Sequence, residues 1–282
     1  MRGPVGCRIL NYMIARRLMV AVLVLFAALR AQAATLTPEA RAAYERYVAQ
    51  VEARLAQQHQ STQNFIVVNE KDAETKLSRG KVLLQRFKAD QPPGAMIHHW
   101  SATMLVPGAT AADFLRVVRD YDHYPEIYGQ HFTQAKVLQH EGDDYELLTR
   151  VTQHRIVTVV LDVQSTNQFG ALDATHGYIT SRSTDIREIA DPGKSTEHAL
   201  PPGQEHGFLW SLNLYWSYEE RPEGLLVQCE TVSLTRDIPW GLGWLIKPLV
   251  QSVPRDALTY TLTQTRNEML RTGQKSQGQP SF

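Results

Sequence analysis

The side chains best suited to binding a small molecule gather on one predicted strand, Phe208 to Glu220. Large apolar residues recur there at every second position, which places them on one face of a strand. Trp210, Trp216 and Tyr218 give this face wide rings with a polar atom at the edge, as in pockets for apolar ligands. We therefore predict that these three side chains contact a ligand. Ordinary core packing gives the same pattern, so the spacing leaves both interpretations open.

A second aromatic group, Tyr121, Tyr124 and Tyr128, follows a predicted helix. A tyrosine combines an apolar ring with a hydroxyl that can orient a ligand. We predict that these residues contact the ligand at the rim of a cavity, and we add Trp100 on the preceding strand to the ligand-binding set. The alternative is a loop that ends the helix and packs on the sheet.

Glu230 stands out among the charged residues, because Val227, Cys229 and Val232 make its strand apolar on both sides. A buried carboxylate there needs a partner. An arginine such as Arg182, paired with a glutamate inside a cavity, would bind a ligand head group through two hydrogen bonds. The alternative is a solvated face with weak surface ion pairs.

The segment Ile238 to Val253 is apolar, with Lys247 as its one charged residue. Its glycine and proline residues disfavour a regular helix. We predict that Trp240 and Trp244 in this segment contact the ligand as part of a lid, or touch a membrane surface transiently. The alternative is a buried connection to the last helix.

No residue pattern indicates a metal or a cofactor, and we predict neither. His98 and His99 are adjacent, so on a strand they face opposite ways, and the other histidines lack metal-binding spacing. The sequence has no nucleophile elbow, phosphate-binding loop or dinucleotide fingerprint. If the protein is an enzyme, the candidate acids and bases are Glu230, His98 and Tyr121.

The elements that position these residues begin with the unit Trp100 to Tyr128. Its strand ends at Pro107-Gly108, and Thr110 and Asp113 have the spacing of a capping box for the following helix. Further strands are predicted at 135–140, 145–156, 157–164, 177–189, 208–220 and 225–236, with a long loop at 190–207. A final helix is predicted from Pro254 to Gly273, and 273–282 is expected to be a disordered tail.

Residues 34–93 are predicted to be an extension before the main domain. A helix opens at Thr37-Pro38, and 65–68 and 81–87 are expected to form a hairpin at a sheet edge. The break at Asp90 to Gly94 marks the boundary.

Residues 1–33 have the pattern of a secretory signal peptide, with an arginine-rich start, an apolar run and Ala31-Gln32-Ala33. We expect cleavage after Ala33 and a periplasmic or secreted protein; the alternative is membrane anchoring by an uncleaved segment. The remaining chain carries 24 basic and 29 acidic residues, which argues against a nucleic-acid partner. It also keeps Cys229 alone, so no intramolecular disulfide forms and stability must come from a core.

The order of elements from about residue 94 resembles the START-like, helix-grip superfamily (SRPBCC-type), which includes lipid-transfer and polyketide-cyclase relatives. The residues that carry the resemblance are Val106 to Gly108, the helix from Ala111, Tyr121 to Pro125, the hairpin from Trp210 to Arg236 and the terminal helix. The resemblance implies an α+β fold over 94–272, with a curved antiparallel sheet wrapped around a long C-terminal helix. It also implies a cavity for a lipid or another hydrophobic small molecule.

Three functions remain open at this point. The first is a non-catalytic exported binding protein for a hydrophobic ligand. The second is a cyclase-type enzyme acting on an aromatic or polyketide-like substrate. The third is an envelope interaction module that uses the N-terminal helix.

Overall fold

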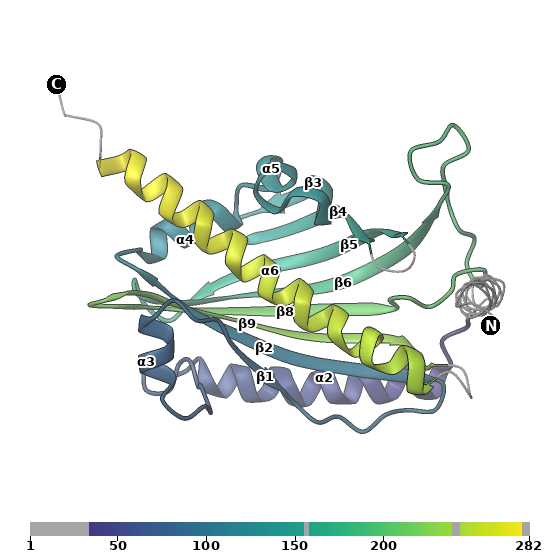
Figure 1. The fold of residues 1–282 in the computed structure, drawn as a ribbon, viewed down its shortest axis with the longest axis horizontal. Helices are drawn as coiled ribbons and strands as arrows, with labels where there is room; N and C mark the ends of the chain where they lie inside the picture. Colours follow the sequence, from purple (N-terminus) through teal and green to yellow (C-terminus); the bar gives the residue numbers. More distant parts are fainter. Residues whose placement is uncertain (1–33, 155–157, 239–242, 278–282) are drawn as a thin grey trace, which may run out of the picture.

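The computed structural model describes residues 34–154, 158–238 and 243–277, which form one curved antiparallel sheet with helices on both faces (Figure 1). The signal-peptide prediction for 1–33 lies outside these residues. Along the sheet the strand order is β1-β2-β9-β8-β6-β5-β4-β3, and β7 pairs with β6. The strands are β1 Leu83–Arg86, β2 Ala95–Pro107, β3 Phe132–Glu141, β4 Asp144–His154, β5 Thr158–Ala171, β6 His176–Ala190, β7 His198–Ala199, β8 Ser211–Arg221 and β9 Gly224–Arg236. The helices are α2 Pro38–Gln58, α3 Ala73–Ser78, α4 Ala111–Val118, α5 Tyr124–Tyr128 and α6 Gly243–Gln277, with short 3₁₀ turns at Tyr121–His123 and Gly129–His131.

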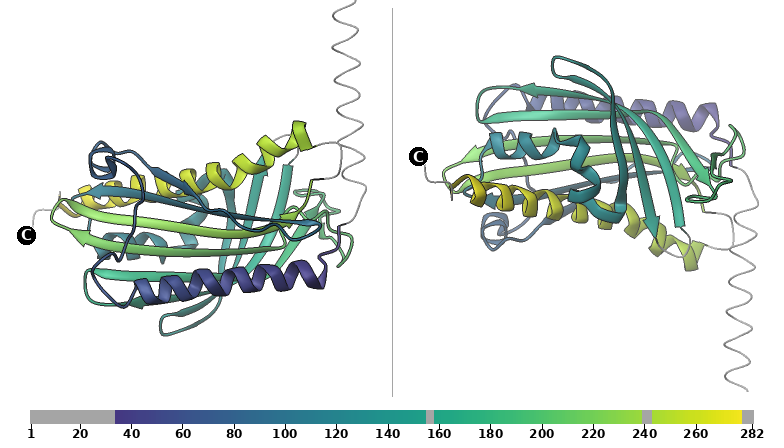
Figure 2. Two further views of the ribbon diagram at one scale, coloured as in Figure 1. Left: turned by 90° about the horizontal axis from the view of Figure 1, so that it is seen from below. Right: turned by 90° about the horizontal axis from the view of Figure 1, so that it is seen from above.

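The sheet lies between two long helices, α6 on its concave face and α2 on the opposite face (Figure 2). Alternation along β9 explains why both faces are apolar. Val227 and Cys229 pack in the core beneath α6, whereas Val232 and Leu234 pack against α2. β9 is therefore buried on both sides along most of its length, and its buried residues include the polar side chains of Glu230, Thr231 and Ser233.

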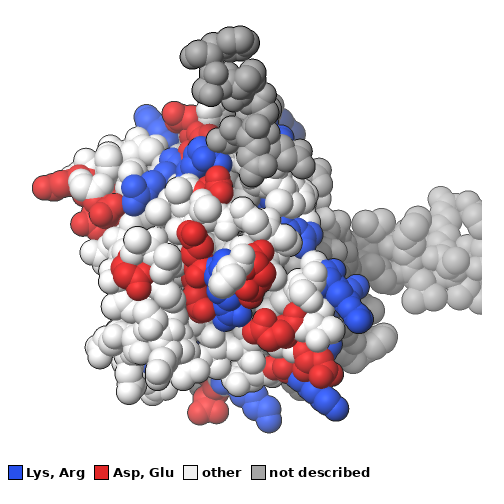
Figure 3. Space-filling model, turned by 90° about the vertical axis from the view of Figure 1, so that its left-hand side faces the viewer, with Lys and Arg blue, Asp and Glu red and all other residues white. Residues whose placement is uncertain are grey.

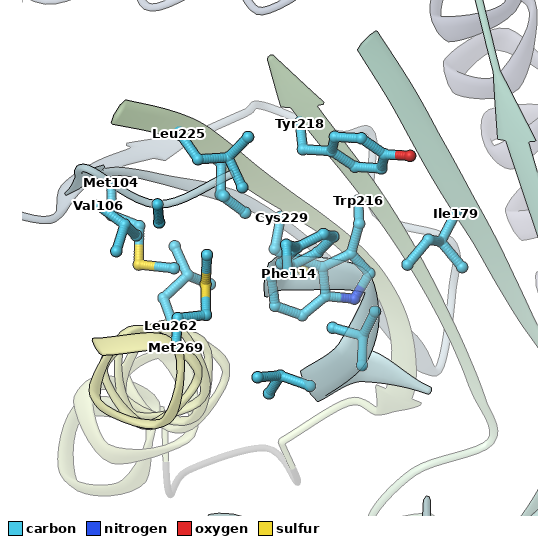
Figure 4. Packing of buried hydrophobic residues seen from close by; sticks show 14 of the residues in the cluster. Met104, Val106, Phe114, Ile179, Trp216, Tyr218, Leu225, Cys229, Leu262 and Met269 are labelled. Carbon is cyan, nitrogen blue, oxygen red and sulfur yellow. The ribbon is translucent and has the colours of Figure 1, made fainter. Parts of the chain in front are cut away.

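The main core fills one end of the space between the sheet and α6 (Figure 4). Met104 from β2 and Trp216 from β8 meet Phe114 from α4, and Leu262 and Met269 enter from α6. The Phe114 and Trp216 ring centroids are 5.6 Å apart. Cys229 is fully buried in this core, as predicted, and burial raises the pKa of its thiol well above the usual range.

The predicted capping box at the start of α4 is confirmed. The Asp113 N–H donates to Thr110 Oγ1 at 3.2 Å, and the Thr110 N–H donates to Asp113 Oδ2 at 3.0 Å. The next free amide of the helix, Ala111 N–H, donates to Glu220 Oε2 at 2.9 Å. The helix start is therefore tied both to its own turn and to β8.

The extension before β2 differs in part from the prediction. α2 begins where expected, and the Ala40 N–H donates to Thr37 Oγ1 at 3.1 Å. Residues 65–68 do not form a strand, so the predicted hairpin does not form. The charged segment after them folds into α3, and β1 pairs with β2 at the sheet edge.

The last helix is longer than its sequence pattern predicted. α6 begins at Gly243, well before Pro254, and continues through Gly273 to Gln277. Thus the glycine and proline residues of the 238–253 segment do not prevent helix formation from Gly243 onward. Among the described helices, none combines the length and apolar character needed to cross a membrane.

Surface charge is mixed rather than gathered by sign. Figure 3 shows acidic and basic side chains next to each other on one end of the molecule. Exposed ion pairs such as Arg119 with Asp143 (2.7 Å) and Arg116 with Asp113 (2.7 Å) account for this kind of surface. Such pairs contribute little to stability.

Candidate ligand-binding cavity

A cavity of about 470 Å³ lies between the concave face of the sheet and the helices α5 and α6. It occupies the space beside the main core, where α6 stands away from the outer strands. Strands β4, β5, β8 and β9 form its floor and far wall. Its roof comes from α6, with Pro254, Ala257 and Leu258, and from the tyrosines around α5.

Tyr121, Tyr124 and Tyr128 all line the cavity, where the sequence placed a rim. Their rings contact one another, with the Tyr121 and Tyr124 centroids 5.2 Å apart and those of Tyr124 and Tyr128 5.0 Å apart. The Tyr124 hydroxyl donates to the Val118 carbonyl at 2.8 Å, and the Tyr128 hydroxyl is 3.0 Å from Thr265 Oγ1. Burial raises the pKa of Tyr128 to about 12, so the cavity roof is uncharged at neutral pH.

The wall from β8 consists of Leu212, Leu214 and Trp216. Trp216 is 8% exposed and lies at the boundary between the cavity and the main core. Trp216 and the three tyrosines are the four predicted ligand-binding side chains that border the cavity. Their contact with a ligand stays a prediction.

Most of the far wall was not identified from the sequence. It is built by Leu147 and Val151 on β4 and by Val159, Leu161 and Val163 on β5. These residues recur at period two, so the signal of a shared face was present. Nothing in the period shows which face of a strand lies toward a cavity.

Trp100, Trp210 and Tyr218 do not line the cavity, contrary to the prediction. Trp100 packs beside the main core, and the Arg86 guanidinium lies 5.7 Å from the centre of its ring. Tyr218 belongs to the main core, 5.3 Å from Phe114 between ring centroids. Trp210 packs in the cluster under α2, because it precedes the first residue of β8 and so does not follow the alternation of that strand.

Arg182 and Glu230 also lie away from the cavity, on the face of the sheet that α2 covers. Arg182 Nε donates to Glu52 Oε1 on α2 at 2.6 Å. The Glu230 side chain is 3% exposed and contacts Arg54 on α2 and His99 Nε2, the latter at 2.7 Å. The expectation that a carboxylate at 230 is buried and paired is confirmed, but its partner is not Arg182 and it does not face a ligand.

His99 links this buried carboxylate to the surface of α2. Its Nδ1 is 2.7 Å from the Tyr47 hydroxyl, and the Phe87 ring stacks on the imidazole with centroids 4.1 Å apart. Tyr47, Arg54, His99 and Glu230 therefore form one connected polar group, which we call the α2 latch.

The remaining predicted residues are Trp240 and Trp244, in the apolar segment Ile238 to Val253. Trp240 lies outside the described residues. Trp244 lies within α6, but its side chain is outside the described part of the structure. Their predicted role as a lid or membrane contact stays a prediction.

The polar groups of the cavity are mostly neutral. Thr231, Ser233 and Thr235 on β9 and His98 on β2 border it, and its ionic residues among those described are Arg236 and Asp237 at the end of β9. Burial, with a smaller effect of Arg86, lowers the pKa of His98 to about 4. In the described part of the chain, no cluster of His, Cys, Asp and Glu could hold a metal ion.

The curved antiparallel sheet, the helix α4 after the first long strand and the long α6 across the concave face define the START-like helix-grip fold, as predicted. The N-terminal helix α2 on the opposite face is an addition to it. The cavity between sheet and α6 is where the resemblance implied a hydrophobic ligand.

Comparison with solved structures gives matches of low sequence identity. The chain matches a protein from Thermus thermophilus at 14% identity, covering 61% of this chain and 97% of that one with a TM-score of 0.45. It matches the Zhui aromatase/cyclase from a Streptomyces species at 13% identity, covering 62% and 95%, with a TM-score of 0.43. A STAR-related lipid transfer protein from Xanthomonas axonopodis matches at 16% identity, covering 66% and 98%, with a TM-score of 0.41. No family model and no curated protein sequence matches the chain.

Proposed function

We propose that this protein is a non-catalytic carrier or sensor that binds one lipid or other hydrophobic small molecule between the sheet and α6. The observation that carries the proposal is the cavity of about 470 Å³ with mainly apolar walls. Pockets for small ligands span roughly 300–1,000 Å³ and combine apolar walls with a few polar groups. A purely structural module would be expected to fill this space with side chains.

The position of Glu230 supports binding over catalysis. Glu230 was the one carboxylate among the candidate acids and bases, and it lies on the α2 face of the sheet, away from the cavity. His98 and Tyr121 border the cavity without a carboxylate partner among the described residues. General acid–base catalysis needs a proton donor or acceptor with a matched pKa near the substrate.

The proposal includes export, which rests on the pattern of residues 1–33 alone. A cleaved signal peptide would give a mature chain that begins at Ala34 and is recovered in the periplasmic or external fraction. N-terminal sequencing of the protein from fractionated cells tests this. A full-length chain in the membrane fraction would favour the anchored alternative.

The binding proposal predicts that blocking the cavity removes ligand binding without unfolding the protein. Ala257→Phe places a ring into the cavity from α6, where Ala257 lines the roof. We expect the affinity for the neutral dye Nile red to fall about tenfold or more, which corresponds to a loss of roughly 1.4 kcal/mol or more. Fluorescence titration measures it, and native mass spectrometry of the purified protein tests for a copurified lipid.

The matched control is Asn267→Phe, the same ring on an exposed position of the same helix. It should bind the dye as the unaltered protein does. Equal affinities for the Ala257 and Asn267 variants would show that the dye does not occupy this cavity and would contradict the proposal.

A further inference from the structure

Three buried polar side chains lie together on the cavity floor: His98, Thr231 and Ser233, which we call the polar floor. They are 5%, 8% and 6% exposed. His98 on β2 is directly opposite Ser233 on β9, and Thr231 is two residues away on the same face. Side chains directly opposite across an antiparallel pair have Cβ atoms about 4.5–5.5 Å apart, so one small group can reach both.

The Thr231 and Ser233 hydroxyls have no hydrogen-bond partner among the described residues. In the same part of the chain, no fully buried side-chain nitrogen or oxygen atom lacks a partner. The two hydroxyls therefore border open space, and the space that both residues line is the cavity.

His98 offers a lone pair to the same space. Its Nε2 is 3.0 Å from Thr235 Oγ1, and that hydroxyl donates to the Arg236 carbonyl at 3.2 Å. A hydroxyl that gives its proton to a carbonyl accepts from the imidazole, so Nε2 carries the hydrogen and Nδ1 is an acceptor. No described residue is a partner of Nδ1.

The charges of the cavity restrict what this subsite accepts. Arg236 and Asp237 lie next to each other at the end of β9, and the described lining around the polar floor has no formal charge. Arg86 lies close enough to lower the pKa of His98, but in the described residues no charged side chain forms a hydrogen bond with the polar floor, so an ion buried there would lose its hydration without a direct counter-charge. A neutral hydroxyl, in contrast, both donates and accepts, which matches an imidazole acceptor beside serine and threonine hydroxyls.

We propose that the polar floor binds the hydroxyl group of a neutral, otherwise apolar ligand, which donates to His98 Nδ1 and accepts from Ser233. This inference rests on the proposed function and adds the chemical class of the ligand. The rest of the ligand lies against the apolar walls of β4, β5 and β8. The site thus selects an alcohol over a carboxylate or an ammonium group on the same chain.

The test is displacement of Nile red from the full chain by four probes of one chain length. The two ionic probes are used below their critical micelle concentrations and the two neutral probes below their solubility limits. These are dodecane, 1-dodecanol, dodecanoate and dodecyltrimethylammonium. We expect 1-dodecanol to bind about tenfold more tightly than each of the other three, as one or two hydrogen bonds imply. His98→Phe and Ser233→Ala should each reduce this preference several-fold, measured in each variant as the ratio of the affinity for 1-dodecanol to the affinity for dodecane.

Ser101→Ala is the matched control, a buried serine on the same strand as His98 but on the α2 face. It should leave the preference for the alcohol intact. Binding of Nile red without a preference for the alcohol would overturn this inference and leave the proposed function standing, as would equal effects of the Ser233 and Ser101 variants. Absence of any Nile red binding would overturn both.

Discussion

Glu230 shows how one buried carboxylate fixes an element that the minimal helix-grip fold lacks. Its side chain is 3% exposed and has His99 and Arg54 as partners, so α2 supplies part of the charge balance for β9. Removing one member of a buried ion pair costs more than the pair contributes, because the remaining charge keeps its desolvation cost. Arg54 is 43% exposed and can return to water, whereas His99 cannot.

We therefore expect Glu230→Ala to destabilise the protein by about 3 kcal/mol, the lower end of the range for broken buried pairs. Urea unfolding followed by circular dichroism measures the free energy of unfolding. Glu74→Ala is the control, because Glu74 is 75% exposed in its pair with Arg221 and its loss should change stability little. Similar values for the two variants would show that the α2 latch does not stabilise the fold.

At the scale of the element, α6 has two roles along its length. Its later turns insert Leu262 and Met269 into the main core, and its earlier turns form the cavity roof with Ala257 and Leu258. The helix is thus anchored at one end by packing, and at the other it borders empty space.

Leu262→Ala should destabilise the protein by roughly 2–5 kcal/mol, because the side chain is fully buried and the removed methyl groups leave a cavity. Leu270→Ala on the exposed side of α6, where Leu270 is 39% exposed, is the comparison and should have a much smaller effect. Thermal unfolding of both variants measures this. A larger loss for the Leu270 variant would contradict the packing described for α6.

The sequence was sufficient for most of the long strands after residue 94, for the capping box and for the order of the main elements, because these depend on local spacing. The length of α6 was not predictable in the same way. Gly243, Pro248 and Pro254 each disfavour a helix locally, and the helix nevertheless includes all three. Intrinsic propensity is a weak preference that tertiary packing can override.

The cavity was predictable only in part, for a geometric reason. Period two shows which residues of a strand share a face, but not which face the sheet curves around. Trp216 borders the cavity, so its predicted contact with a ligand stays a prediction, whereas Glu230 borders α2 and does not face the cavity. The prediction missed Leu161 and Val163, because the predicted strand 157–164 contains no aromatic residue and the sequence-based choice of ligand contacts started from aromatic side chains.

At the scale of the whole molecule, the buried His98 and the half-buried His59 make stability depend on pH. Burial lowers the pKa of His98 and of His59 to about 4 from an ordinary value of 6.5. Between these values the unfolded chain binds protons that the folded chain does not, so the free energy of unfolding falls as the pH falls from 6.5 toward 4.

We expect His98→Phe to flatten this pH dependence, because it removes one of the two sites. For His98, a pKa lowered from 6.5 to about 4 corresponds to a loss of roughly 3 kcal/mol in the free energy of unfolding as the pH falls across that range. Urea unfolding at pH 7, 5.5 and 4.5 measures the slope. An unchanged slope in the variant would show that the pKa of His98 is the same in the folded and the unfolded chain.

The α2 latch has a consequence for how a ligand enters. α2 holds the convex side of β2 and β9 through the latch and through the Tyr44 hydroxyl, which donates to the Val232 carbonyl at 2.9 Å. We infer that these contacts keep the bend of the sheet, and so the trough that it forms, the same whether or not a ligand is bound. We therefore expect ligand exchange to come from motion of the opposite wall, where the cavity-lining residues of α6 precede the packed Leu262 to Met269 segment. Because the trough is formed in advance, little of the binding free energy goes into ordering it, and the rate of exchange reports the movement of a single helix.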